Sequence, residues 1–497
     1  MRWLESCLFV ISAAMNIAVM ALCLPCYASD GKTSLLAPVQ INERGTGEAR
    51  SIIQAKGKLT LEVYLRAVDA NFPGLISAED QRRIASANRL EKQGAFDPLL
   101  STEDGYTRMQ NTSKIGEPKR VLFNYPKIEL PFRSGIRAFA QYRYNPNSSQ
   151  SPYIETGEGG EYSAGLFVPL LRGFVYNEQS VAEREAKYGE QLAVQTYLLT
   201  RLDTLMRAGT AYWNWVGSKQ KADVSQSIMT LANVVTDIAK QQERNGDLAR
   251  IYVTEAEEDL QRRDADLSQS RRDFQRFSFK LSSLLFDIGG LPLPLPTEDN
   301  VPQMPRPQPI SESETEHHIV LALATRPELK AIEVQKKIVT VELKLAQNQL
   351  LPAVNLVATY GRDTGFHGIG NAYRAQATFS EPVLLRAAKG KVAAAKLRLD
   401  KLSKDRQAEE QRIRNEVLDA ISAINLAYKR FLALEQQVEK AEQVYLGERE
   451  RFNVGDSTVF LMAERERQLN EAKIRMIDAE VEYHIGILAL KAITSRL

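Results

Sequence analysis

Residues 243–260 read ERNGDLARIYVTEAEEDL, and residues 452–469 read FNVGDSTVFLMAERERQL. A shift of 209 positions places Gly246 on Gly455 and Asp247 on Asp456. Both Gly-Asp pairs interrupt long, charged, amphipathic stretches. Glycine tolerates positive φ and therefore ends helices readily. The repeat predicts two helical hairpins, each of which turns at one of these glycines.

Two further pairs of segments repeat in the same order. LTLEVYLRAVDANFPGL (59–75) resembles TEHHIVLALATRPEL (315–329), and LFVPLLR (166–172) resembles FSEPVLLR (379–386). The prolines of residues 291–309 forbid helix continuation and favour an extended linker. We therefore predict these segments: a signal peptide (1–28), an N-terminal extension (29–58), a first repeat (59–290), a Pro-rich linker (291–312) and a second repeat (313–497).

The first 28 residues have the layout of a secretory signal peptide, with Arg2, an apolar run and a small-residue end at Ala28. A membrane anchor helix is the alternative, but Asn16 and Pro25 interrupt the apolar run. The three cysteines of the chain all lie in this segment, at Cys7, Cys23 and Cys26. The mature chain is thus expected to be exported and to contain no disulfide.

Each half is expected to contain long helices around a strand-like block. We predict helices over 59–92, 177–242 and up to 285 in the first half, and over 313–350, 389–452 and 457–494 in the second. A helix of ~65 residues extends about 100 Å, which two shorter helices stacked end to end would match. Both long helices carry apolar seams with 4,3,4,3 spacing, which favours near-parallel helix packing. These seams are Val224, Ile228, Leu231, Val235 and Ile238, and Val417, Ile421, Ile424, Tyr428 and Phe431.

The strand-like blocks alternate between aromatic or apolar and polar residues, as in SGIRAFAQYRYN (134–145) and EYSAGLFV (161–168). The second half contains AVNLVATYG and AYRAQATFS, joined by the glycine-rich loop GRDTGFHGIGN (361–371). In an exported protein, such strands can face lipid on one side and water on the other. Two or three strands per half cannot close a membrane barrel, which needs ~8 or more. Several chains would have to share one.

No catalytic, cofactor-binding or metal site is expected from the sequence. The net charge of +2 gives no field that would attract nucleic acid. Gly157, Gly159 and Gly160 lack the strand–helix context of a dinucleotide site. None of the four histidines has metal-ligand spacing. An enzyme is therefore not predicted.

Together, the duplicated order of helix, strands, VPLLRGF (168–174) or EPVLLR, long helix, Gly-Asp tip and return helix resembles the TolC-type outer-membrane efflux and secretion channel family. The resemblance runs from about Leu59 to the C-terminus. It implies a mainly helical fold with a β part, in which a homotrimer forms an α-barrel tunnel in the periplasm. Each chain is expected to give four strands to one 12-stranded transmembrane β-barrel in outer-membrane lipid. The implied partners are a periplasmic adaptor protein and an inner-membrane transporter, without nucleic acid and without cofactors.

The resemblance also implies functional residues. The adaptor-docking edge is expected to include the residues of the two tips, Asn245, Gly246, Asp247, Leu248, Val454, Gly455, Asp456 and Ser457. Glu464 lies nine residues after the second tip glycine, at a position where the family has acidic side chains around the periplasmic aperture. The alternative is a solvated Glu464 on the outer face of its helix, beside Arg465 and Arg467.

One segment departs from the family pattern. Residues 121–145 resemble an additional strand pair, which would either enlarge the barrel or form an extracellular hairpin, and the second half has no equivalent. A rival reading of the whole chain is an exported coiled-coil adaptor or rod without a barrel. It explains the seams and tips but assigns no purpose to strand blocks at equivalent repeat positions. The transported substrate and the cognate pump are not predicted.

Overall fold

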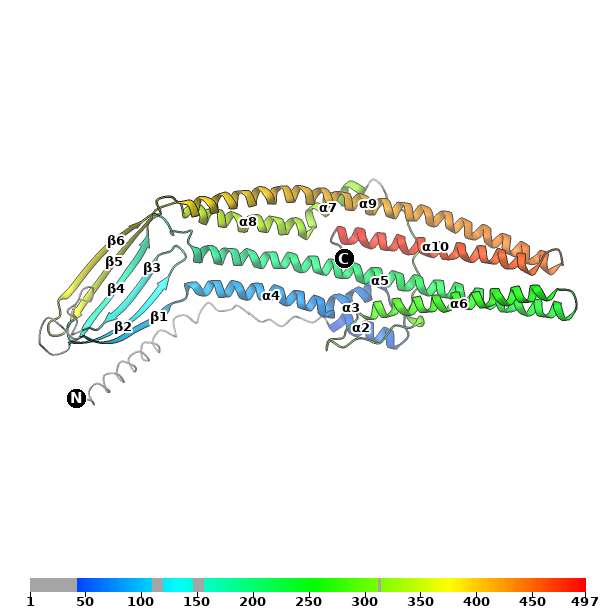
Figure 1. Cartoon of the computed structure of the whole chain (residues 1–497), viewed down its shortest axis with the longest axis horizontal. Coiled ribbons are helices and arrows are strands. Elements are labelled where there is room, and N and C mark those ends of the chain that lie inside the picture. Colours follow the sequence, from blue (N-terminus) through cyan, green and yellow to red (C-terminus); the bar gives the residue numbers. More distant parts are fainter. Residues whose placement is uncertain (1–42, 110–118, 146–155, 312–313) are drawn as a thin grey trace, which may run out of the picture. The chain divides into compact units, whose positions relative to one another are not determined.

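The computed structural model describes residues 43–109, 119–145, 156–311 and 314–497 (Figure 1). The predicted signal peptide, and the extension as far as residue 42, lie outside the described residues. The described chain forms two compact units. One unit contains residues 83–191 and 334–402, and the other contains the remaining described residues up to 82, 192–333 and 403–497.

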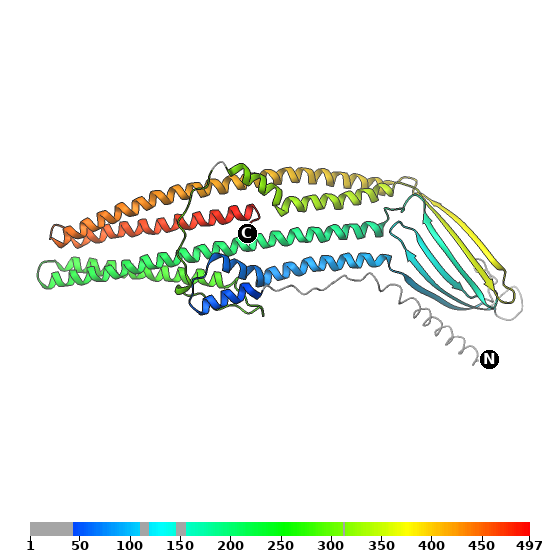
Figure 2. The ribbon, with the colours of Figure 1, turned by 180° about the vertical axis from the view of Figure 1, so that it is seen from behind.

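Helices make up most of the second unit, and the first unit combines helices with strands. Their bounds are α2 Glu43–Gln54, α3 Leu61–Asn71, α4 Pro73–Gln93, α5 Glu178–Arg244, α6 Arg250–Ser282, α7 Thr315–Thr325, α8 Pro327–Asn348, α9 Arg386–Asn453 and α10 Val459–Ile493. Both views show α6 running back along α5 and α10 running back along α9 (Figure 1 and Figure 2). None of the described helices is long and apolar enough to cross a membrane.

The entering helix of each repeat is divided in two, where a single helix was predicted. Phe72 and Arg326 have extended backbone, with ψ of 121° and 125°, and each precedes a proline. Because the proline ring crowds the preceding residue out of the α region, α3 ends before Pro73 and α7 ends before Pro327. The break recurs in both halves, which supports the predicted repeat.

The strands form one antiparallel sheet in the order β1-β2-β3-β4-β5-β6. Their bounds are β1 Leu99–Met109, β2 Lys119–Pro131, β3 Arg137–Arg143, β4 Gly160–Pro169, β5 Ala353–Thr364 and β6 Gly370–Ser380. The expectation of four strands per chain is therefore wrong, because the described residues form six. The segment 121–145 supplies β2 and β3, so the additional strand pair predicted there is confirmed as part of this sheet.

The core of the helical unit centres on aromatic residues of α5. Trp215 is fully buried, and its indole Nε1 donates to Ser278 Oγ of α6 at 3.0 Å. The Tyr212 hydroxyl donates to the Leu59 carbonyl at 2.8 Å. The seams of α5 and α9 are buried or half-buried, as predicted; Val235, Val417 and Ile424 are at most 6% exposed.

The Pro-rich linker is not a free extended segment. Asn300 is fully buried, and its side-chain amide donates to the Gly57 carbonyl at 2.9 Å. Leu293 and Val301 belong to the same core cluster as Trp215. The prolines prevent helix formation, as predicted, but the apolar residues between them are drawn into the core because burial removes apolar surface from water.

Candidate functional site

The two predicted tips have the same backbone geometry. Gly246 and Gly455 have φ of +83° and +81°, the left-handed region that favours glycine. At the end of α5, Asp247 N donates to the Gln242 carbonyl at 2.9 Å, and at the end of α9 Asp456 N donates to the Arg451 carbonyl at 2.8 Å. At each tip, the glycine N–H donates a second backbone hydrogen bond, to a carbonyl three residues earlier. The two hydrogen bonds together form the Schellman motif, which ends helices. The duplicated Gly-Asp pair thus makes the same turn twice.

The side chains of the two tips differ. In the second tip, Arg451 Nε lies 3.1 Å from Asp456 Oδ2, and Ser457 contacts Glu448. Thr458 caps α10 by accepting from Leu461 N at 3.2 Å. The equivalent N-cap of α6 is Ala249, whose side chain cannot accept a hydrogen bond. The second tip is therefore the more firmly held of the two.

The first turns of α6 and α10 also contact each other. The rings of Tyr252 and Phe460 lie 5.3 Å apart. Next to them, Val235, Val459 and Met462 form a small buried cluster. The two hairpins of one chain are thus joined near their tips by apolar side chains, while Val454 remains 79% exposed.

Glu464 lies on α10 within an ion pair. Its carboxylate accepts from Arg467 at 2.6 and 2.8 Å and from Gln468 at 2.9 Å, and its side chain is 41% exposed. The hydrogen bond from Arg467 is the main reason that the pKa of Glu464 is lowered, to about 2. Within one chain Glu464 is therefore charged and partnered.

One face of the sheet is apolar and exposed. Because side chains alternate along a strand, β4 directs Tyr162 and Leu166 to this face, and β6 directs Tyr373 and Phe379 there. Tyr373 is 79% exposed and Phe379 69%. A contiguous exposed surface of this kind indicates that something apolar covers it.

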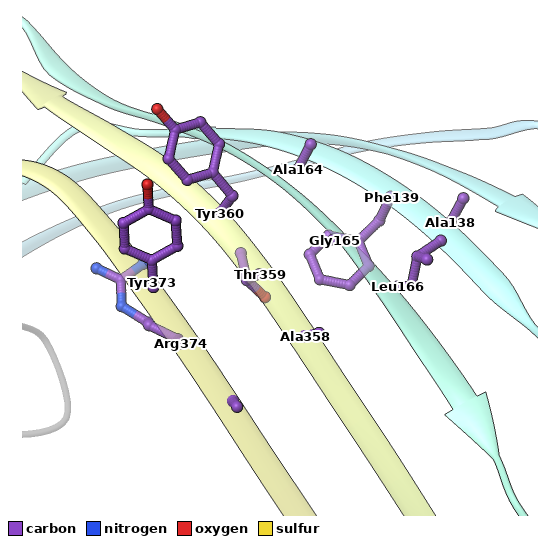
Figure 3. A pocket seen from close by; sticks show the side chains of 11 residues that line it. Ala138, Phe139, Ala164, Gly165, Leu166, Ala358, Thr359, Tyr360, Tyr373 and Arg374 are labelled. Atoms are coloured by element: carbon purple, nitrogen blue, oxygen red, sulfur yellow. The ribbon is translucent and has the colours of Figure 1, made fainter.

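This apolar face carries a hollow of about 670 Å³. Figure 3 shows the ring of Tyr360 beside that of Tyr373, with Ala164 and Ala358 on the neighbouring part of the sheet. Seven of the eleven residues that line the hollow belong to the apolar face by strand alternation. They are Ala138, Ala164, Leu166, Ala358, Tyr360, Tyr373 and Ala375.

The opposite face of the sheet carries paired charges. Glu161 of β4 is only 1% exposed and accepts from Arg143 of β3 at 2.6 Å and from Arg374 of β6. On the same face, Glu129 of β2 pairs with Lys127 at 2.5 Å and with Arg137 at 3.0 Å. Buried charges are costly unless they are paired and hydrogen-bonded, and these are. We call this the charged face.

The charged face also contains aromatic rings. Phe139 lies here rather than with Tyr142, because the two residues have opposite parity on β3; the alternation predicted for 134–145 is wrong on this point. Lys127 Nζ lies 5.1 Å from the centre of the Phe139 ring, and the Arg137 guanidinium lies 4.1 Å from that of Phe167. The cations thus cover these rings.

Across the part of the chain that the structure describes, no three His, Cys, Asp or Glu side chains gather as potential metal ligands. His484 stacks on Trp213 at 4.2 Å, and its Nε2 lies 2.8 Å from the Pro305 carbonyl. Burial lowers the pKa of His484, so the neutral ring is favoured. This histidine has a packing role.

Solved outer-membrane channels have a similar fold. The chain is 17% identical to the outer-membrane channel OprN, with a TM-score of 0.64 over 88% of this chain and 90% of that one. It is 14% identical to the CmeC outer membrane channel of Campylobacter jejuni, with a TM-score of 0.65 over 88% and 85%. It is 15% identical to the outer membrane protein VceC of Vibrio cholerae, with a TM-score of 0.65 over 87% and 95%.

The sequence of the second half of the chain resembles a known family. Residues 318–496 match the family model described as outer membrane efflux protein. The chain is similar to this family over these residues, which make up less than half of its length. No curated protein sequence matches this chain. The resemblance drawn from the duplicated motifs is confirmed, and the family is one of channel proteins.

Several contacts of the described site are not predicted from the sequence. Arg374 contacts Glu161, which is 213 residues away in the sequence, and no local sequence pattern predicts that contact. Tyr252 and Phe460 each follow a tip glycine, but their contact depends on how the hairpins pack. A weak signal was present for Arg143, since charged residues alternate with aromatic ones at the end of β3.

Proposed function

We propose that three copies of this chain form one exit duct of a tripartite efflux or type I secretion system. The strands close a shared barrel in outer-membrane lipid, and the helices form the periplasmic tunnel. Substrates then pass from a periplasmic adaptor and an inner-membrane transporter to the exterior. The proposal extends the similarity to outer-membrane channels to an assembly and to its partners.

The observation that carries the proposal is the division of the sheet into two faces. The apolar face, with exposed Tyr373 and Phe379, suits lipid, and the charged face, with Glu161, suits a water-filled lumen. The chain's described strands form a sheet whose edge strands are β1 and β6. Unpaired edges in lipid would leave backbone groups unsatisfied, so copies of the chain must pair edge to edge. An adaptor or rod without a barrel would expose this apolar face to water, which disfavours that alternative.

The assembly can be tested by extracting the protein from outer membranes in detergent and measuring the mass of the particle. We expect three chains per particle, with the β-structure retained. A monomeric particle with full β-content would contradict the proposal.

We further propose that the two tips contact the adaptor. Support comes from the exposure of Val454 and from the identical turns at Gly246 and Gly455. Single cysteines at Asp247 or Val454 should crosslink to the adaptor in cells, because the mature chain is expected to contain no other thiol. A cysteine at Gly447, earlier on α9 and with open space around it, is the matched control. Equal crosslinking at the tips and at position 447 would refute tip-specific docking.

The aperture role of Glu464 also remains our proposal. In a trimer three such carboxylates would converge on a narrow mouth and attract cations. Within one chain, the Glu464 carboxylate is paired with Arg467. A surface role for the same pair is the competing possibility, and channel recordings distinguish the two.

A further inference from the structure

The hairpin β2–β3 has no counterpart in the second repeat. There, β5 follows α8, and β6 leads into α9 through EPVLLR. In the first repeat, β1 follows α4 and β4 leads into α5 through VPLLRGF. The strands β1 and β4 therefore correspond to β5 and β6, and β2–β3 is inserted between them.

We propose that this inserted hairpin enlarges the membrane wall, so that three copies close an 18-stranded barrel instead of a 12-stranded one. The inference rests on the proposed trimer. It concerns the width of the exit. The family resemblance implied four strands per chain and therefore a narrower, 12-stranded barrel.

Backbone pairing places the inserted hairpin within the wall. β1 is paired with β2 along the whole of β1, from Met109 opposite Lys119 to Leu99 opposite Glu129. β3 pairs with β4 from Arg137 opposite Phe167 to Arg143 opposite Glu161. The hairpin therefore separates β1 from β4, and a sheet without it would need a new β1–β4 pairing.

The apolar face continues across the inserted strands. Leu130 is exposed on β2, and the Tyr142 ring of β3 lies 4.7 Å from that of Tyr162 on β4. On β5 and β6, Tyr360 and Tyr373 form a matching pair at 5.1 Å. Tyrosines grouped near one end of the strands are typical of the aromatic girdle at a membrane interface. A hairpin outside the membrane would have no reason to share this pattern.

The charged face is continuous as well. Lys127, Glu129 and Arg137 link β2 to β3, and Arg143 then links β3 to Glu161 of β4. Positive and negative groups are both present along this wall, so it would select only weakly by charge. The apolar and charged faces of β2 and β3 thus coincide with those of β4, as expected for neighbouring strands of a membrane wall.

An inserted pair of strands also preserves closure. Because two strands were added, β1 and β6 still run in opposite directions and can pair antiparallel between copies. Barrel diameter grows roughly linearly with strand number, and barrels of 16 to 18 strands leave an aqueous channel. The barrel would be about 1.5 times as wide as a 12-stranded one. Such an exit suits cargo bulkier than a small molecule.

Electron cryomicroscopy of the purified full-length protein tests this directly. We expect three chains and eighteen strands. Three chains with twelve wall strands, and β2–β3 outside the wall, would overturn this inference and leave the proposed function intact. A particle without three chains would overturn the proposed trimer, and this inference with it.

Adjacent residues of β3 provide a matched pair of variants. Ala140 lies on the apolar face and Gln141 on the charged face. If β3 spans the membrane, Ala140→Lys should reduce the amount of heat-stable trimer at least several-fold, while Gln141→Lys should leave it near the wild-type level. Equal effects of the two substitutions would overturn the inference. Deletion of residues 119–143 should also narrow the barrel about 1.5-fold, measured by exclusion of neutral polymers added from the extracellular side; an unchanged exclusion size in an assembled deletion variant would count against the proposal.

Discussion

Replacing the second tip glycine with alanine should loosen the tip without disturbing the packing of the helices. Gly455 has φ of +81°, and a Cβ there would meet no atom within 4 Å. The cost of Gly455→Ala is therefore the strain of left-handed backbone alone, about 1–2 kcal/mol. That free energy corresponds to a factor of about 5 to 30 in the local opening equilibrium. Gly455→Asn should cost less, because asparagine tolerates this conformation.

Hydrogen exchange followed by mass spectrometry measures the opening in the assembled protein. The amide of Asp456, which donates to the Arg451 carbonyl, should exchange about 5- to 30-fold faster in Gly455→Ala. Gly447→Ala is the control, since Gly447 lies inside α9 with open space around it and alanine favours the helix by about 0.5–1 kcal/mol. Equal exchange in the Ala and Asn variants, or faster exchange in the Gly447 control, would refute the argument.

Three further predictions concern α10 and the caps of the tips. Thr458→Ala should destabilise the start of α10 by about 1 kcal/mol, whereas Ala249→Thr should add the missing cap to α6. The hydrogen-exchange rate of the first-turn amides should rise in the first variant and fall in the second, and an unchanged rate in both would count against the capping assignment. Glu464→Gln should lower cation selectivity and weaken block by multivalent cations in single-channel recordings if Glu464 lines the aperture, and an unchanged channel would leave it as a surface partner of Arg467. Burial raises the pKa of Glu466 to about 7, above its ordinary value, so the folded protein should lose stability as pH rises from about 4.5 through 7. The melting temperature of Glu466→Gln should therefore exceed that of the wild type by more at pH 8 than at pH 5, and a pH-independent difference would contradict the assignment.

The full number of strands was not predicted from the sequence. Strand β1, LLSTEDGYTRM (99–109), has little apolar alternation and was not predicted. Its main-chain groups pair with β2, so the neighbouring strand specifies it more than its own side chains do. By contrast, β4 to β6 were predicted because their faces differ strongly in polarity.

The sequence by itself determined the repeated helical architecture of this protein. Gly246 and Gly455 end helices for reasons of backbone geometry, and the seams have a fixed period. The breaks before Pro73 and Pro327 have an equally local cause, although a single entering helix was predicted in each half. These are local effects, which depend on residues close together in the chain. Only the tertiary structure decided the six-stranded sheet, the burial of Asn300 in the linker, and the meeting of Glu161 with Arg374, because each depends on groups far apart in sequence whose contact no local pattern encodes.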